Sequence, residues 1–186
     1  MKRVIDLLLV IVFFSIFVVP MILIFILICL TSKGPAIYWS DRVGKNNTIF
    51  KMPKFRSMLS QTPTVATHLL NEPDTYLSPI GGFLRRSSLD ELPQLLSVLR
   101  GDMSFVGPRP ALYNQYDLIE LRTKNGINRL MPGITGWAQV NGRDKLSIPD
   151  KVLLEIEYLE RQSILFDMKI LWMTLLKVFK RDGIKH

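Results

Sequence analysis

The feature that most constrains this chain is an uncharged apolar run near its start, from Leu7 to Leu30. Almost all of its 24 residues are Leu, Ile, Val, Phe or Met. As a helix the run would reach about 36 Å, enough for a hydrocarbon core of about 30 Å. It is too long for a secretory signal, and no small-residue cleavage site follows it. We therefore expect this segment to lie in the membrane.

Pro20 divides the run into Leu7–Val19 and Met21–Leu30, and a proline inside a helix removes a hydrogen bond and bends it. The two halves would reach only about 20 and 15 Å, each short of the membrane core. Cations flank both ends, at Lys2, Arg3 and Lys33. Since positive charge favours the cytosolic side, we expect residues 1–32 to form a re-entrant helical hairpin kinked at Pro20. A plain kinked transmembrane helix is the open alternative.

The rest of the chain, residues 33–186, is long enough for one modest domain. The chain carries 24 Lys and Arg against 16 Asp and Glu, a formal net charge of +8. Such a surface suits a nucleic acid, an anionic membrane or a phosphorylated substrate, and charge alone does not choose among them. The single cysteine, Cys29, excludes an intrachain disulfide, so nothing indicates an oxidising compartment.

Asp90 and Glu91 stand side by side just before a predicted helix, Gln94–Arg100, which Gly101 should end. Helix N-termini favour negative charge and also bind phosphate groups. One interpretation is therefore a capping box, Ser88-x-x-Glu91. The other is a functional carboxylate pair, because three arginines bracket it: Arg85, Arg86 and Arg109.

The remaining patterns predict an α+β domain. Ala36–Phe50 is typical of a β-hairpin, followed by the cations Lys54 and Arg56, which either contact phosphate or are solvated. Three helices are expected, over Tyr113–Lys124, Pro149–Arg161 and Asp167–Lys180. The last is apolar on one side and basic elsewhere, which suits a helix on the membrane surface or one packed in the core. Residues 60–80 read as an irregular connector, and Met131–Arg143 as a glycine-rich loop that either approaches a ligand or simply turns the chain.

Three segments together resemble the bacterial sugar transferase family, the catalytic unit of the monotopic phosphoglycosyl transferases. They are Ser88–Gln94, Gly101–Pro110 and Pro132–Arg143. The resemblance covers nearly the whole chain. It implies transfer of a sugar 1-phosphate from a UDP-sugar to a polyprenyl phosphate such as undecaprenyl phosphate, with release of UMP and with Mg²⁺ at the site. The family's re-entrant helix is often kinked at Ser-Pro, whereas this chain has Val19-Pro20.

The resemblance also implies roles for single residues. Asp90 would be the nucleophile that becomes an aspartyl-phosphosugar, Glu91 its helper, and both would lie at the Mg²⁺. Arg85 and Arg109 would bind substrate phosphate. The full set predicted to bind substrate is Lys54, Arg56, Arg85, Arg109, Gln139, Asn141 and Arg143. The chemistry is coherent, since arginines and Mg²⁺ can offset the charge of a diphosphate facing a carboxylate nucleophile.

The resemblance places the protein in the bacterial inner membrane, with its catalytic domain on the cytosolic face. It would catalyse the first membrane step in the synthesis of a surface glycan or glycoconjugate, such as lipopolysaccharide. An N-acetylated amino sugar is the expected sugar, and whether it is a 6-deoxy sugar is left open. A nucleic-acid partner is not expected, and a homodimer or a complex with other enzymes of the pathway is left open. The alternative is a non-catalytic, membrane-anchored basic adaptor for anionic lipid or nucleic acid. An ordinary glycosyltransferase is a further rival, although no Asp-x-Asp metal motif supports it.

Overall fold

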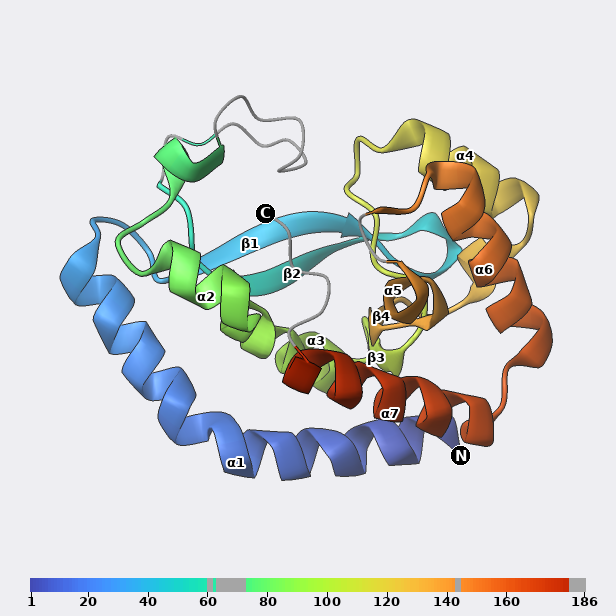
Figure 1. Cartoon of the computed structure of the whole chain (residues 1–186), viewed down its shortest axis with the longest axis horizontal. Coiled ribbons are helices and arrows are strands. Elements are labelled where there is room, and N and C mark those ends of the chain that lie inside the picture. Colours follow the sequence, from blue (N-terminus) through green and yellow to red (C-terminus); the bar gives the residue numbers. More distant parts are fainter. Residues whose placement is uncertain (60–61, 63–72, 143–144, 181–186) are drawn as a thin grey trace.

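The computed structural model describes residues 1–59, 62, 73–142 and 145–180 (Figure 1). It has the expected α+β composition: an apolar N-terminal helix, two small two-stranded sheets and a set of short helices. Most of the expected connector and the predicted substrate-binding residue Arg143 lie outside the described residues.

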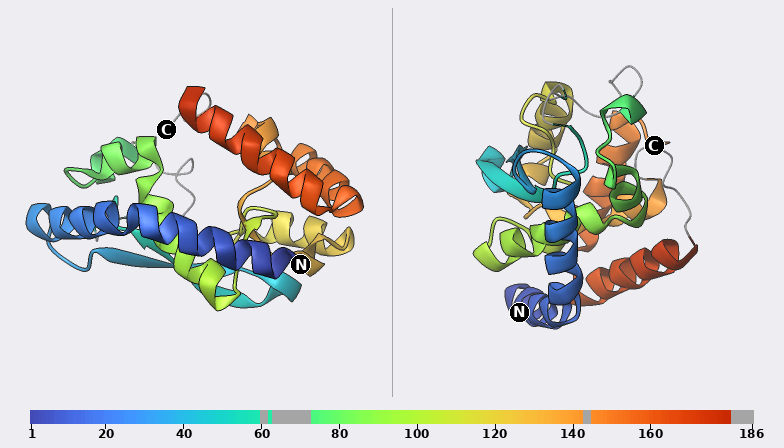
Figure 2. Two further views of the ribbon diagram at one scale, coloured as in Figure 1. Left: turned by 90° about the horizontal axis from the view of Figure 1, so that it is seen from below. Right: turned by 90° about the vertical axis from the view of Figure 1, so that its left-hand side faces the viewer.

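The N-terminal helix α1 (Lys2–Thr31) passes through Pro20 as one element and is bent along its length (Figure 1). By length and composition it is able to cross a membrane. Figure 1 shows α1 along the lower edge of the body, and in the left view of Figure 2, seen from below, it crosses in front of the other elements. Most of its side chains are exposed; the buried ones are Asp6 and Val10 near its start, and Ile24 and Ile28 near its end.

Each end of α1 is fixed to the same folded body. Near the start, Asp6 Oδ1 accepts hydrogen bonds from Ser104 Oγ at 3.0 Å and from the Phe105 N–H at 3.1 Å. Lys2 forms an ion pair with Asp167. Near the end, Ile28 is fully buried in a small apolar cluster that also contains Ala36, Phe55 and Leu84.

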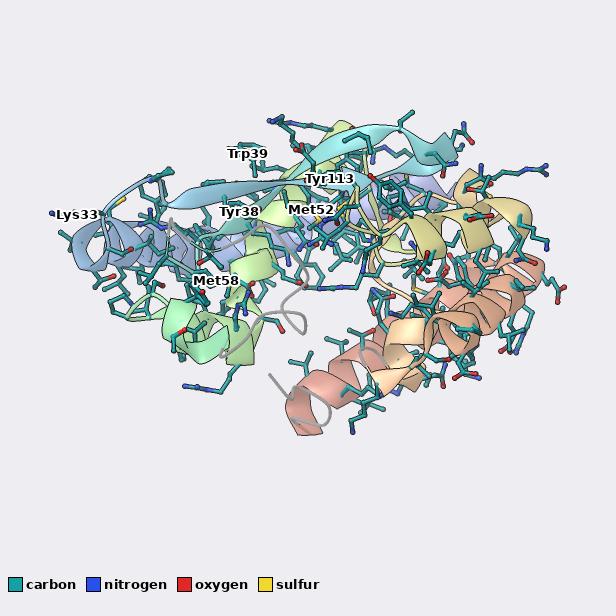
Figure 3. All side chains as sticks on the ribbon, turned by 90° about the horizontal axis from the view of Figure 1, so that it is seen from above. Lys33, Tyr38, Trp39, Met52, Met58 and Tyr113 are labelled. Carbon is teal, nitrogen blue, oxygen red and sulfur yellow. The ribbon has the colours of Figure 1, made fainter. Side chains whose placement is uncertain are left out.

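The predicted β-hairpin is confirmed. Strands β1 (Ile37–Val43) and β2 (Ile49–Phe55) pair antiparallel, with Tyr38 opposite Lys54 and Arg42 opposite Phe50. The turn η1 (Lys45–Asn47) holds Asn46 and Asn47 at positive φ, a conformation that asparagine tolerates better than most residues. Tyr38 and Trp39 lie on opposite sides of β1, as successive strand residues do (Figure 3).

A second sheet is a parallel pair that the sequence patterns did not indicate. Strand β3 (Ser104–Val106) pairs with β4 (Gly133–Thr135). The prediction of a loop over residues 131–143 is therefore wrong in part, because this stretch contains β4 and then α5 (Trp137–Asn141). Parallel pairing depends on a partner distant in sequence, which a local pattern does not reveal.

Short helices lie between the two sheets in sequence. They are η3 (Pro73–Tyr76), α2 (Gly81–Ser87), η4 (Leu89–Gln94) and α3 (Leu95–Arg100). Gly101 ends α3 at φ 95°, as its predicted role as a helix terminator requires.

The C-terminal half is helical. It comprises α4 (Tyr116–Lys124), η5 (Ile127–Arg129), α5, α6 (Ile148–Arg161) and α7 (Ile164–Lys180). All three predicted helices are confirmed, although α7 starts three residues earlier than expected. The main core joins α1, β3, α3, α4, α6 and α7, with Val98, Tyr158 and Ile170 almost fully buried. A buried ion pair, Arg122–Glu155, connects α4 to α6, with Arg122 Nε 2.7 Å from Glu155 Oε2.

Candidate active site

The carboxylate pair lies in the first turn of η4, which continues into α3. Its position at a helix N-terminus is thus as predicted. The capping-box interpretation is wrong: Ser88, at φ 56°, makes no side-chain capping bond. That left-handed residue ends α2 and starts η4, so the chain turns sharply just before Asp90.

Two basic side chains from distant parts of the chain form ion pairs with Glu91. Its Oε1 accepts a hydrogen bond from Lys54 Nζ at 2.7 Å and one from Arg109 Nη2 at 3.0 Å. The side chains of Glu91 and Lys54 are only 14% and 15% exposed. Charge-assisted bonds in such a protected place are stronger than exposed ion pairs. Glu91 therefore joins β2 and the Pro-Arg-Pro segment to the start of η4.

Asp90 is buried, with 8% of its surface exposed. Burial is the largest influence on its carboxyl group and raises its pKa, while the charges of Lys54, Arg85 and Arg109 act to lower it. Glu91 raises the pKa further by repulsion. Asp90 is thus a carboxylate whose charge is poorly solvated, with three cations close by.

Lys54 reaches the pair from β2. Burial lowers its pKa, and the attraction of Glu91 opposes that effect. Arg85 reaches the pair from α2, where its Nε donates to Ser57 Oγ at 3.1 Å and its Nη2 lies 3.1 Å from Met58 Sδ. Both bonds hold the guanidinium against the segment that follows β2.

Arg109 is positioned by the parallel sheet. Gly107 N–H donates to the Thr135 carbonyl at 2.9 Å, and Gly133 N–H donates to the Pro108 carbonyl at 2.8 Å. A Cβ on Gly133 would lie 2.1 Å from the Gly107 nitrogen, so only glycine permits this approach. The glycines of the expected loop therefore bring main chain against main chain and fix the segment that carries Arg109.

The other residues predicted to bind substrate lie in different surroundings. Arg56 is buried at the end of α1, where its Nη1 donates to the Lys33 carbonyl at 2.8 Å and its Nη2 to the Ser32 carbonyl at 2.9 Å. These bonds hold its guanidinium against the turn that follows α1. Gln139 and Asn141 lie in α5 and donate to the Ile134 and Trp137 carbonyls, within their own segment. Their role in substrate binding stays a prediction.

Arg42 is a residue that the sequence patterns missed. From β1 its Nη1 donates to the Pro110 carbonyl at 3.1 Å, next to Arg109, and the charges of Arg109 and Glu91 both act on it. The alternation of side chains along a strand could have indicated Arg42, because it puts Tyr38, Ser40 and Arg42 on one face of the hairpin.

The residues present suit Mg²⁺ in the way that nucleotide sites use it. Among the described residues, no group of three or more His, Cys, Asp and Glu side chains gathers to form an all-protein cage. Mg²⁺ often needs only one or two carboxylates, completed by substrate phosphate oxygens and water. Asp90 and Glu91 could supply those carboxylates.

Asp90 is buried and the neighbouring Glu91 is ion-paired to Lys54 and Arg109. Together with an apolar helix of membrane-spanning length, this indicates the class of membrane-associated proteins with a charged site suited to anionic ligands. The family model for bacterial sugar transferases matches residues 1–181. The chain belongs to the bacterial sugar transferase family.

Relatives of known name agree with this family. The chain is 43% identical over 162 residues to the UDP-glucose:undecaprenyl-phosphate glucose-1-phosphate transferase of Escherichia coli, a match that spans 81% of this chain and 34% of that protein. It is 36% identical over 168 residues to the undecaprenyl-phosphate galactose phosphotransferase of Salmonella typhimurium, spanning 81% and 34%. It is 39% identical over 155 residues to EpsL, an uncharacterized sugar transferase of Bacillus subtilis, spanning 82% and 74%. The chain thus spans about a third of the length of the two enzymes named for glucose and galactose.

Proposed function

We propose that this chain is a membrane phosphoglycosyl transferase that moves a sugar 1-phosphate from a UDP-sugar to undecaprenyl phosphate and releases UMP. The observation that carries the proposal is the buried Asp90, beside Glu91 and surrounded by cations from three separate elements. The names of the relatives support the lipid acceptor and the kind of group transferred.

The transfer takes two steps at one phosphorus atom. First, an Asp90 carboxylate oxygen attacks the phosphorus that bears the sugar. A new O–P bond forms, the bond from that phosphorus to the bridging oxygen breaks, and UMP leaves with the electron pair. Second, a phosphate oxygen of undecaprenyl phosphate attacks the same phosphorus, which releases Asp90 as a carboxylate and completes the lipid-linked diphosphate sugar.

The cations make the first step feasible. A diphosphate repels a carboxylate nucleophile, and fixed positive groups offset this repulsion as charge develops on the leaving oxygen. Arg109 and Lys54 are held at Glu91, and Arg85 at Ser57, so their charges are in place before the substrate arrives. When bound by Asp90 and Glu91, Mg²⁺ would neutralise further charge on the substrate oxygens.

The decisive experiment uses the purified full chain with Mg²⁺, undecaprenyl phosphate and a panel of UDP-sugars. The panel holds UDP-glucose, UDP-galactose and N-acetylated amino sugars, including 6-deoxy forms, and the released nucleotide is identified. UMP release with one sugar supports phosphoglycosyl transfer. UDP release would refute it in favour of simple glycosyl transfer, and no release with any sugar would favour the non-catalytic adaptor.

Omitting the lipid acceptor tests the covalent intermediate. With the accepted sugar, the intact-protein mass should rise by one sugar phosphate for the wild type and stay unchanged for Asp90→Asn. The matched control is Asp117→Asn, an exposed aspartate in the first turn of α4, which should gain the adduct like the wild type. An adduct on Asp90→Asn would remove Asp90 from the nucleophile role.

We also propose that α1 enters and leaves the membrane on one face, so that the catalytic body lies on the cytosolic side of the inner membrane. The support is that both ends of α1 contact the same body, through Asp6 at the start and Ile28 at the end. Exposed apolar side chains on α7, among them Leu165, Trp172 and Val178, support a position of that helix in the bilayer surface.

Cysteine labelling tests this arrangement. In a Cys29→Ser background, one cysteine is inserted after Met1 and, in a separate protein, Lys51→Cys marks the catalytic body, where the Lys51 side chain is 73% exposed. Both should react with an impermeant reagent only after the cells are permeabilised. Labelling of the first cysteine from the periplasmic side alone would establish a spanning helix instead.

A further inference from the structure

Arg42 lies on the hairpin face that presents Lys54 to the carboxylate pair. Cross-strand partners in an antiparallel pair share a face, and Tyr38 is opposite Lys54. Residues two and four positions further along β1 point to that same side, so Ser40 and Arg42 join it. The active-site face of the hairpin therefore carries two cations, Lys54 and Arg42.

The Arg42 side chain is fixed to the segment that follows Arg109. Its Nη1 donates to the Pro110 carbonyl at 3.1 Å and its Nε to Ser40 Oγ at 3.0 Å. The main chain continues the contact: Val43 N–H donates to the Ala111 carbonyl at 2.9 Å, and Arg42 forms a β-bridge with Leu112. A guanidinium carries more N–H donors than these two side-chain bonds use, so Arg42 can still bind an anion.

Two guanidinium groups that are close together and partly desolvated repel each other. Burial lowers the pKa of Arg42 to about 10, and the next largest cause is the positive charge of Arg109. Among the described residues, the cations Arg42, Lys54, Arg85 and Arg109 surround the carboxylates Asp90 and Glu91. The excess of positive charge is what a multiply charged anion would neutralise.

We propose that Arg42 is a further substrate-binding residue, which grips the diphosphate of the nucleotide sugar together with Arg109 and holds the Pro-Arg-Pro segment in place for it. The inference rests on the proposed function. The Arg42 side chain serves both purposes: its hydrogen bond to the Pro110 carbonyl holds the segment, and its guanidinium adds positive charge for the diphosphate. The two arginines come from elements about seventy residues apart and meet only in the folded chain.

The test uses Arg42→Gln and Arg42→Lys in the full chain, with Arg129→Gln as the matched control. Arg129 is exposed in η5. The probes are Mg²⁺-pyrophosphate and UDP, whose binding is followed by the rise in melting temperature with probe concentration. Loss of one charge-assisted contact should weaken binding of both probes about 10-fold or more in Arg42→Gln. Arg42→Lys keeps the positive charge but not the planar guanidinium, so its affinity for both probes should lie between those of the wild type and Arg42→Gln. Arg129→Gln should bind both probes as the wild type does.

Kinetics and stability separate binding from packing. With an accepted UDP-sugar, Arg42→Gln should raise KM by a factor similar to its loss of probe affinity, and should lower kcat by a smaller factor. Unchanged pyrophosphate affinity in Arg42→Gln would overturn the inference. So would a loss of affinity in both Arg42 variants that merely accompanies a collapse of the melting temperature without anion, since Arg42 would then be a packing residue.

The inference and the proposed function can fail separately. UMP release by the wild type, together with an Arg42→Gln variant that binds pyrophosphate normally, would leave the function standing and overturn the role of Arg42. Arg42-dependent pyrophosphate binding without UMP release from any sugar would do the reverse: it supports the anion site and refutes the reaction.

Discussion

Replacing each carboxylate of the active-site pair by its amide should change stability in opposite directions. Glu91→Gln keeps the shape of the side chain but removes the charge that Lys54 Nζ and Arg109 Nη2 contact at 2.7 and 3.0 Å. A hydrogen bond to a charged group contributes about 1 kcal/mol more than a neutral one, so two such bonds lose about 2 kcal/mol. For a chain of this size that corresponds to a fall in melting temperature of about 4–8 °C.

Asp90→Asn should instead raise the melting temperature at neutral pH. Burial is the dominant influence on Asp90 and raises its pKa, which means that its ionised form destabilises the fold despite the nearby cations. The sign follows from linkage: a raised carboxyl pKa contributes stability at low pH that is lost as pH rises through the folded-state pKa. The advantage of the Asp90→Asn variant over the wild type should therefore grow with pH, because an amide does not titrate.

The assay is thermal unfolding of the full chain in one detergent, recorded for the wild type and both variants at acidic and neutral pH. Asp117→Asn, at an exposed site, is the control for loss of a charge and should melt close to the wild type. The reasoning is refuted if Asp90→Asn melts as far below the wild type as Glu91→Gln does. Such a result would mean that attraction by Lys54, Arg85 and Arg109 outweighs the cost of burial.

Three further predictions concern turnover, the glycines and the buried ion pair. Turnover, followed as UMP release, should fall at least about 10³-fold in Asp90→Asn, and in the wild type it should decline with acidification at a pH above the ordinary aspartate range, because Asp90 must be ionised to attack. A flat profile down to that range would contradict a raised pKa. Gly133→Ala should lower the free energy of unfolding by about 1–3 kcal/mol, because its Cβ would lie 2.1 Å from the Gly107 nitrogen. It should also raise KM, because that contact positions the segment that carries Arg109. The control is Gly82→Ala, whose Cβ would meet only side-chain atoms of Arg86 and Leu77. Arg122→Met alone should destabilise the fold by about 3–5 kcal/mol by stranding Glu155, and the double change Arg122→Met with Glu155→Leu should recover most of it in a denaturant melt; equal losses in both proteins would contradict this account.

Much of the site was visible in the sequence because its signals are local. The run from Leu7 to Leu30, the hairpin turn and the helix start at Asp90–Glu91 each depend on neighbouring residues, and the structure has all three elements where the patterns placed them. The order and spacing of the motifs carried the family resemblance, which the match over residues 1–181 confirms. The apolar run, the carboxylate pair and the family were thus determined by the sequence itself.

Tertiary structure decided which cation meets which partner. Lys54, Arg56 and Arg42 look alike as basic residues near one hairpin, yet Lys54 reaches Glu91, Arg56 binds the carbonyls at the end of α1, and Arg42 holds the Pro110 carbonyl. The parallel pairing of β3 with β4, which positions Arg109, was also beyond local patterns. The physical reason is that a charge or a backbone group has many compatible partners, and only the close packing of distant segments selects one of them and removes it from water.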